Sequence, residues 1–483
     1  MNPTIKTYQD NPAIQRKRWS ILIILNLFVF MSTLDGSIVN IALPVISETL
    51  HLPIVKTQWV VSSYLIAICT FILLFGKLGD SFGKIKIFKL GTIIFLIGSL
   101  LCGFSSSLPL LILFRIIQAV GASMTMANSQ GIITEIFPPK ERGKALGLIG
   151  TFVSLGSIAG PSLGGFLVSA FGWEYIFWVN IPIGVIAVAL GWRMLPVDIT
   201  FVKAKTDVFG SLLFSIFIIS LFAGLLLGQE TGYEDIRIVI SLILAVVTFV
   251  AFLWIESRIS NPMLQFSLFK NASFSLSILC GFLAFVANFC FNIISPFYTQ
   301  NILHLSPVSA GLLLMLFPIS MAIVAPLSGA LSDKIGSELL TFVGLLVMVV
   351  AQVGLATLHN GSSIIVVGIL VALLGLGNGI FQSPNNSLVM SSVPRSQLGI
   401  AGSINSLVRN IGMVVGIAVA TTTLFGVMSA KAGYHVTGLI PDRPDLFIAG
   451  MHIVFIGSAS ICLVSAFLTG FRLFKAKVTI RQQ

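Results

Sequence analysis

Long apolar segments separated by short polar ones run through the whole sequence. A helix rises about 1.5 Å per residue and the hydrocarbon layer of a bilayer is about 30 Å thick, so about 20 apolar residues are needed to cross it. Fourteen segments meet this requirement, near residues 20–43, 58–76, 87–105, 108–133, 145–170, 175–195, 207–228, 236–256, 273–297, 308–330, 338–358, 363–390, 398–427 and 447–471. Apolar residues make up 56% of the chain and charged ones 9%, which excludes a water-soluble domain. The chain is expected to be an all-α polytopic membrane protein with 14 transmembrane helices.

The positions of the basic residues indicate the orientation of the chain. Lysine and arginine are concentrated in cytoplasmic loops, and an even number of spans places both termini on one side of the membrane. With both termini in the cytoplasm, 22 of the 28 basic residues lie in cytoplasmic segments. The others lie outside or within spans: Lys56, Arg237, Lys431, Arg443, Arg115 and Arg409. The net charge of +11 is therefore an orientation signal, and nucleic acid is not expected as a partner.

Two short patterns recur after nearly the same interval. Residues 76–83 after the second span match residues 329–336 after the tenth, at an offset of 253, and residues 138–143 match 394–399 at an offset of 256. Two matches at nearly one offset favour duplicated halves. The expected division is a cytoplasmic tail without a signal-peptide cleavage pattern over 1–19, a six-helix half over 20–195, two inserted helices (about 207–228 and 236–256) with linkers over 196–272, a second six-helix half over 273–471 and a cytoplasmic tail over 472–483.

The fifth apolar segment contains a run of small residues around a proline, Gly156-Ser-Ile-Ala-Gly160-Pro161-Ser-Leu-Gly164-Gly165. The proline removes a backbone donor, and glycines without Cβ atoms let a neighbouring helix approach closely. In a membrane helix this combination is typical of a packing seam or a hinge. A bare Gly-x-x-x-Gly pair is explained by tight packing alone, so only the longer pattern favours a functional interpretation.

The longer pattern resembles the antiporter motif in the fifth span of drug exporters of the major facilitator superfamily. The segment after the second span is similar to the most widespread motif of that superfamily and contributes Gly76, Asp80, Gly83 and Lys84. Three further segments resemble the fourteen-span drug:proton antiporters, namely residues 34–44, 115–118 and 172–182. The chain departs from these motifs at Ala119, where glycine is usual, and at Glu174, where arginine is usual.

The resemblance implies a major facilitator fold, in which two pseudo-symmetric six-helix halves, here with two inserted helices, rock about a central site and exchange protons for substrate. It also implies a role for the cytoplasmic ends of the second and tenth spans. Asp80 and Asp333 would latch the closed inner gate, each near a helix N-terminus and near Lys84 or Lys334. In this interpretation the two carboxylates are conformational switches and not proton carriers.

Asp35 lies within the first span, where an ionisable group costs about 2.5–3.5 kcal/mol on insertion scales. Burial disfavours a charged carboxyl, so Asp35 is a candidate proton carrier. Asp35 and Arg115 each lie seven residues from the outer end of their spans, about 10 Å below the surface, so that the two side chains can pair. The alternatives are a permanent ion pair that fixes helix packing and a structural carboxylate held by Asn40 or Arg115.

Two further ionisable residues have open roles. Glu135, near the inner end of the fourth span, is either a second candidate for proton coupling or an interfacial residue paired with Lys140 or Arg142. Arg409, near the middle of the thirteenth span, must meet a carboxylate, carbonyl dipoles or water. It either faces a cavity and holds an anionic group of a substrate, or packs against the opposite half.

Polar and aromatic side chains within the spans are candidates for lining a central substrate cavity. They are Asn26, Gln58, Tyr64, Asn128, Asn288, Asn292, Tyr298, Asn378, Phe381, Gln382, Asn385 and Asn386. Any one of them can instead be a hydrogen-bonding contact between helices. The 38 phenylalanines favour apolar or aromatic ligands. The resemblance implies that some exporters of divalent lipophilic cations carry additional acids in the second half. The scarcity of acids after the eighth span here argues against such cations and favours a monovalent cation, a neutral compound, a zwitterion or a lipid-like amphiphile.

Together these features predict a proton-coupled antiporter that exports small amphipathic or drug-like compounds by alternating access across a bacterial cytoplasmic membrane. No phosphate-binding loop is present in the sequence, so a proton gradient is the expected driving force, and no cofactor, metal or enzymatic activity is expected. The expected partners are a small-molecule substrate, protons and bilayer lipids, with a monomer as the working assembly. The alternatives are a narrow-substrate metabolite or lipid exporter of the same fold and a non-transporting membrane sensor or scaffold.

Overall fold

The computed structural model describes residues 7–138, 141–199, 208–232, 234–259, 266–394, 398–440 and 443–481. Within these ranges, side chains are not described at residues 142–144, 146–147, 150–151, 154, 208, 230, 333, 398–400, 403 and 474–481. The predicted gating residue Asp333 is among them, as is Arg142, and Lys140 lies outside the described ranges altogether. Secondary structure in the described part of the chain consists of helices and turns.

Six membrane-crossing units form the N-terminal half. They are α1 (Pro12–Thr49), α2 (Ile54–Thr57) with α3 (Trp59–Phe82), α4 (Lys84–Gly103), α5 (Leu108–Ile136), α6 (Arg142–Ala170), and α7 (Tyr175–Trp178) with α8 (Asn180–Met194). A short 3-10 helix, η1 (Tyr8–Asp10), precedes α1. The α1 helix begins before the predicted span because Asn11 caps it, accepting a hydrogen bond from the Ala13 backbone N–H, and Pro12 stands at its first position.

The remaining helices are two inserted ones and six further crossing units. The insert is α9 (Val208–Thr231) and α10 (Ile236–Glu256), followed by the short η2 (Phe266–Lys270). The C-terminal half comprises α11 (Ala272–Phe297) continued by the π-helical η3 (Tyr298–Ile302), α12 (Pro307–Leu314) with α13 (Leu316–Ile335), α14 (Ser337–Leu355), α15 (Ile364–Ser391), α16 (Leu398–Ala432) and α17 (Pro444–Arg481).

The predicted number of spans is confirmed. Among the described residues, 13 helices are long and apolar enough to cross a membrane. The remaining predicted span coincides with α6, a helix of 29 residues whose apolar stretch is counted over Leu155–Ala170. The structure therefore has a helix at each of the fourteen predicted positions.

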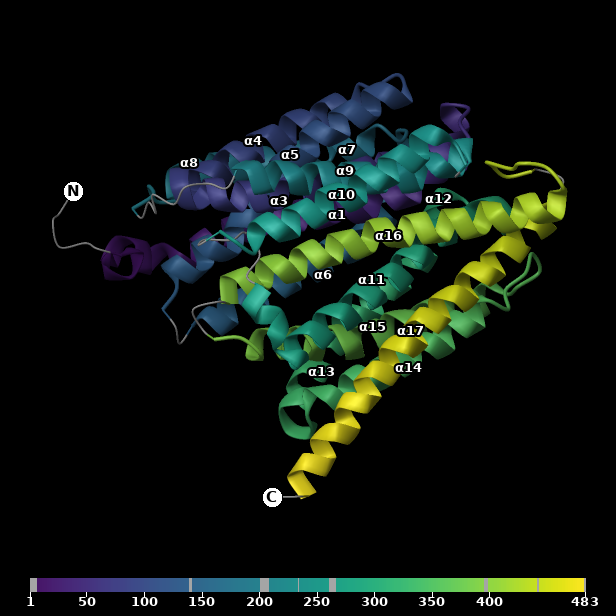
Figure 1. Ribbon diagram of the computed structural model, residues 1–483. Coiled ribbons are helices and arrows are strands. Elements are labelled where there is room, and N and C mark those ends of the chain that lie inside the picture. Colours follow the sequence, from purple (N-terminus) through teal and green to yellow (C-terminus); the bar gives the residue numbers. More distant parts are fainter. Residues whose placement is uncertain are drawn as a thin grey trace.

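The two halves lie side by side, and the inserted helix α9 lies against both of them (Figure 1). The α9 helix packs on α3 of the N-terminal half and on α16 of the C-terminal half, while α10 packs mainly on α9. Elsewhere the halves meet where α6 packs on α12 and α13 and where α16 packs on α3. Both chain ends lie toward the same end of the helices, as an even number of crossings requires; we call the opposite end the outer end.

Equivalent glycines mark the internal repeat. Gly83 ends α3 and Gly336 ends α13, each with a positive φ (106° and 94°) that favours glycine. Close helix contacts also recur: Gly91 of α4 packs on Gly121 of α5, and Gly344 of α14 packs on Gly377 of α15. The offsets between these pairs are 253 and 256, the same as in the sequence repeat. The two halves are therefore related in structure as well as in sequence.

The outer faces of the helices carry large exposed apolar side chains, as lipid contact requires. On α10, for example, Ile243, Val246 and Val250 are 58–63% exposed. Buried apolar side chains from both halves and from α9 form one continuous core. Polar side chains that are buried in this apolar core are therefore candidates for functional residues.

Candidate functional site

A buried ion pair lies inside the N-terminal half. Arg115 on α5 donates to the Asp35 carboxylate on α1 over 2.7 Å from Nη1 to Oδ2, and the two side chains are 1% and 0% exposed. The predicted pairing of these two residues is confirmed. Asn40, the other suggested partner, instead donates to the Gly36 carbonyl within α1.

Two amide side chains complete the shell around Asp35. Gln118 and Asn180 both donate to Oδ1, over 2.9 and 3.0 Å. Gln118 also donates to Ser99 Oγ and accepts from Arg115. Four helices, α1, α4, α5 and α8, thus contribute one fully buried polar network. The carboxylate accepts three N–H hydrogen bonds, which is the arrangement expected of an ionised group.

The guanidinium of Arg115 is enclosed on its other sides. Its Nε donates to the Val60 carbonyl of α3, and its central carbon lies 4.0 Å from the centre of the Tyr64 ring and 5.6 Å from that of Phe177. Aromatic faces stabilise a desolvated cation. Tyr64, predicted to line a substrate cavity, therefore belongs to this charge network. A change of charge at Asp35 would reach α3 and α7 through Arg115.

A second charged cluster lies at the inner end of the N-terminal half. Lys84, at the start of α4, bridges Asp80 (2.8 Å) and Glu135 (2.6 Å). Asp198, in the segment after α8, accepts from the backbone N–H groups of Ile85 and Lys86 over 2.9 and 3.0 Å and so caps α4. The predicted contact of Asp80 with Lys84 is confirmed. The carboxylate at the helix N-terminus is that of Asp198, which the sequence reasoning missed.

Glu135 is therefore held by Lys84, a partner that the sequence analysis did not suggest. We expect Glu135→Gln to leave substrate-induced proton release intact and to lower the free energy of unfolding by at most about 1 kcal/mol, because both partners are partly exposed (28% and 23%). Dye-detected proton release and thermal unfolding of the purified protein check this. Lys84→Gln, which breaks both pairs, is the control and should destabilise more. Loss of proton release in Glu135→Gln would assign the coupling to Glu135.

The glycine-rich run of α6 has two contacting faces. A Cβ on Gly156 would lie 2.7 Å from the Phe30 carbonyl of α1, and Gly160 and Gly164 also face α1. Gly165 faces the other way, against the Pro307 carbonyl at the start of α12. One face of the run therefore packs within the N-terminal half and the other packs against the C-terminal half. The first face is a packing seam, as predicted for small residues.

Gly165 and Pro161 of α6 make a close backbone contact with α12 of the other half, near the outer end of α6. A Cβ on Gly311 of α12 would overlap the Pro161 carbonyl, just as one on Gly165 would overlap that of Pro307. Backbones this close cannot slide past each other unless the helices separate. We use the name outer seam for two contacts between the halves. The first is this contact of α6 with α12, and the second is the hydrogen bond between Val55 and Thr437 that the next paragraph describes.

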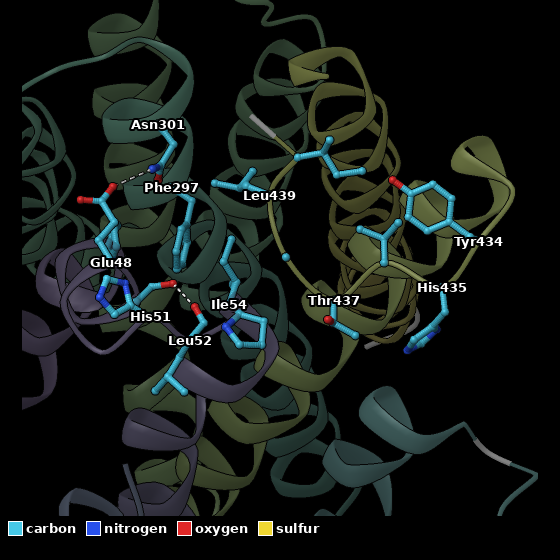
Figure 2. A pocket seen from close by; sticks show the side chains of 16 residues that line it. Glu48, His51, Leu52, Ile54, Phe297, Asn301, Tyr434, His435, Thr437 and Leu439 are labelled. Carbon is cyan, nitrogen blue, oxygen red and sulfur yellow. Dashed lines mark hydrogen bonds between the residues drawn. The ribbon is translucent and has the colours of Figure 1, made fainter. Parts of the chain in front are cut away.

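An open pocket of about 690 Å³ lies beside the contact of Val55 with Thr437, between the end of α1 and the connection from α16 to α17 (Figure 2). Glu48 on α1 accepts from Asn301 of η3 over 3.4 Å, and Val55 N–H donates to the Thr437 carbonyl over 3.4 Å. Gln300 also donates to a carbonyl of α1. These bonds join the two halves and keep the outer end closed in this arrangement.

Most predicted cavity residues of the N-terminal half are engaged in contacts between helices. Gln58 donates to Gln229 of α9 over 2.8 Å, and Gln229 donates onward to the Ala418 carbonyl of α16. Asn128 donates to the Phe75 carbonyl of α3. Asn26 is fully buried, and its amide atoms have no partner among the described residues. For Gln58 and Asn128 these bonds favour the alternative of a contact between helices.

The predicted cavity residues of the C-terminal half form a small polar cluster. Asn288 of α11 donates to Asn378 of α15, which donates to Met321 Sδ of α13. The other members lie on the same helices: Asn292 bonds to the Asn288 carbonyl, Asn385 bonds to the Ser277 carbonyl, Phe381 is 2% exposed and Gln382 is partly exposed. The structure brings Asn288 and Asn378 together where the three helices α11, α13 and α15 meet.

Arg409 has no counter-ion in the described part of the chain. It is partly buried on α16, and its Nε is buried without a hydrogen-bond partner. Gly402, two helical turns earlier on the same face, contacts Gln130 of α5 in the opposite half. Gly416, two turns later on the same face, contacts Val286 of α11 in its own half. Arg409 therefore lies between a contact with the opposite half and a contact with its own half.

Three residues of the hydrogen-bond networks described above could have been suspected from their positions in the sequence. Gln118 and Asn180 stand in segments that match family motifs, and Gln229 is a polar residue near the end of an apolar run. Asp198 has a weaker signal: α4 starts directly after Gly83 without a side chain of its own that can cap it. A capping group from elsewhere in the chain is then required.

Two related helical halves that close against each other at one end, with a buried charge network in one of them, define a multi-pass membrane transporter. The comparisons give the family. The chain belongs to the Major Facilitator Superfamily, whose family model matches residues 25–417. Members of this superfamily are transporters rather than enzymes.

Several relatives are similar over most of their length. The riboflavin transporter RibZ of Clostridioides difficile is 35% identical over 96% of this chain and 100% of its own. The multidrug resistance protein Stp of Mycobacterium tuberculosis is 31% identical over 87% of this chain and 78% of its own, and the multidrug transporter protein MdtP of Bacillus subtilis is 32% identical over 89% and 79%. By name, these relatives are one riboflavin transporter and two multidrug proteins.

The fold is also found among solved structures. A bacterial homolog of the human lysosomal transporter Spinster, in an inward-facing and unoccupied conformation, superimposes with a TM-score of 0.62 at 18% sequence identity, over 95% of this chain and 97% of that one. At this identity the likeness establishes the fold alone.

Proposed function

We propose that this protein is a proton-coupled antiporter that exports small amphipathic compounds across a bacterial cytoplasmic membrane, with both termini in the cytoplasm. The observation that carries the proposal is the buried network of Asp35, Arg115, Gln118 and Asn180. Protonation of Asp35 removes the counter-ion of Arg115 and weakens the hydrogen bonds that Gln118 and Asn180 donate, because a neutral carboxyl is a weaker acceptor than a carboxylate. Because the network joins four helices, a proton there changes how those helices pack.

The coupling follows from the requirement that Arg115 always has a partner. In the closed outer arrangement Asp35 is fully buried and supplies that partner. A proton can reach it only when the surrounding helices separate, and a protonated Asp35 no longer holds α5 to α1. Proton binding and the exchange between inward- and outward-facing arrangements then depend on each other. The glycine-rich contact of α6 with α12 is the place where the halves part.

A second candidate is an exporter or importer with a narrow substrate range. The riboflavin transporter that is 35% identical over the full length of its chain favours it. In that case a single metabolite, and not a range of amphipathic compounds, would move through the protein. The charge network can serve either function.

Proteoliposomes test the proposal. We expect purified protein, reconstituted with a pH-sensitive dye inside, to move protons when amphipathic compounds are added against a proton gradient. A panel of unrelated dyes and antibiotics together with riboflavin separates the two candidates. A response to several unrelated compounds supports multidrug export, and a response to riboflavin alone supports the narrow range. Substrate movement that is equal with and without a proton gradient contradicts proton coupling.

A further inference from the structure

The helices leave one uncompensated charge near the middle of the membrane. Among the described residues, the Asp, Glu, Lys and Arg side chains within the apolar parts of the helices, away from their ends, are Asp35, Arg115 and Arg409. Asp35 and Arg115 neutralise each other at 2.7 Å. Arg409 has no ion pair in this part of the chain, so the interior carries the positive charge of one guanidinium.

An unpaired guanidinium in this position is costly. A buried cation needs an acceptor, and intramembrane charges usually pair or face a substrate path. The Nε of Arg409 is buried without a partner while the side chain as a whole is partly exposed. The planar guanidinium offers its remaining donors in the geometry that suits a carboxylate.

Residues on the same face of α16 as Arg409 contact both halves of the protein. Gly402 lies seven residues earlier on α16, about two turns and 10 Å away, and contacts Gln130 of α5. Asn405, one turn earlier, donates to Asn386 of α15 over 3.1 Å. Arg409 thus shares a face of α16 with residues that contact both the opposite half and α15. A ligand held there would touch elements that move relative to each other.

We propose that Arg409 binds the carboxylate of a monoanionic amphipathic substrate, so that the protein selects anions over cations. This inference rests on the proposed transport function and narrows its substrate class. The apolar residues around the boundary would bind the body of the compound, and the single positive charge would repel lipophilic cations. The uncharged amides Asn405 and Gln130 would tolerate either kind of compound, so Arg409 alone decides the preference.

Three probes with one fluorophore and different charges test the proposal: dansylglycine (anion), its methyl ester (neutral) and monodansylcadaverine (cation). We measure their binding to the purified full-length protein in uncharged detergent at neutral pH. Dansylglycine is expected to bind about ten- to a hundredfold more tightly than the other two, the ratio that charge-assisted hydrogen bonds to a guanidinium give. Arg409→Gln should remove this preference and leave the affinity for the ester within about twofold. Arg409→Lys should retain part of it.

Lys431→Gln is the matched control, since it removes one positive charge at the outer end of the same helix. It should leave all three affinities unchanged. The proposal is overturned if dansylglycine does not bind the parent protein, if the cation binds as tightly as the anion, or if Arg409→Gln keeps the preference. The ranking of probes on the parent protein decides the matter even if a variant fails to fold. Because binding is measured without a gradient, a failure of proton coupling leaves this test intact.

Discussion

Replacing Asp35 with asparagine is expected to abolish substrate-induced proton release. Among the described residues, Asp35 is the carboxylate inside the apolar part of the helices, and all of its hydrogen bonds come from other helices. The same change leaves Arg115 buried without a counter-ion, which costs about 3–5 kcal/mol in folding stability. Proton release in liposomes and thermal unfolding in detergent measure the two effects separately.

A double variant separates coupling from stability. Asp35→Asn with Arg115→Gln removes both charges, so most of the lost stability should return while proton release stays absent. Asp35→Glu keeps the titrating group and is the positive control. Proton release from Asp35→Asn equal to that of the parent would mean that the pair only fixes helix packing. A double variant as unstable as the single one would mean that the hydrogen bonds, and not the charge balance, hold the network.

Adding a side chain at Gly165 or at Gly156 is expected to stop transport for two different reasons. Gly165→Val places atoms against the Pro307 backbone of the opposite half, which forces the outer seam apart. Gly156→Val places them against the Phe30 backbone within the N-terminal half and should lower stability by about 1–3 kcal/mol. Transport should fall about tenfold or more in both, which corresponds to a shift of about 1.4 kcal/mol or more.

Labelling of an introduced cysteine distinguishes the two variants. Val55 is 0% exposed at the outer seam, and the five native cysteines are buried, so Val55→Cys reacts with a membrane-impermeant maleimide when the seam opens. Gly165→Val should speed this labelling, and Gly156→Val should not. Gly457→Val, at a position with no neighbour within 4 Å, is the control for an added side chain. Equal labelling in Gly165→Val and the parent would show that α6 and α12 are not the contact that closes the outer end.

The pairing of Asp35 with Arg115 could be predicted because depth in a membrane helix follows directly from residue number. The motif segments that contain Gln118 and Asn180 could have drawn attention to these two residues, but the sequence does not assign them to Asp35, because amides occur in many of the spans. Which of them meet depends on how each helix is rotated about its axis. An α helix that is apolar on all sides gives no periodic pattern from which to determine that rotation.

The partner of Glu135 could not be predicted from the residues close to it in sequence. Its near neighbours in sequence are Lys140 and Arg142, but α5 ends at Ile136, so these residues lie beyond the helix end. Lys84, 51 residues away, reaches it through the packing of α4 on α5. The spans themselves were predictable from hydropathy, and the tenth one keeps helical backbone dihedrals through Met315, where α12 passes into α13.

The position of α9 makes the two junctions between the halves differ in how they are covered on the lipid-facing side. Where α3 meets α16, α9 packs on both helices. Its Gln229 accepts from Gln58, just before α3, and donates to the Ala418 carbonyl of α16. Where α6 meets α12, the described helices that pack on this junction all belong to the two halves. Among the described helices, a compound dissolved in the bilayer therefore reaches the junction of α6 with α12 without meeting α9 first, whereas α9 covers the junction of α3 with α16.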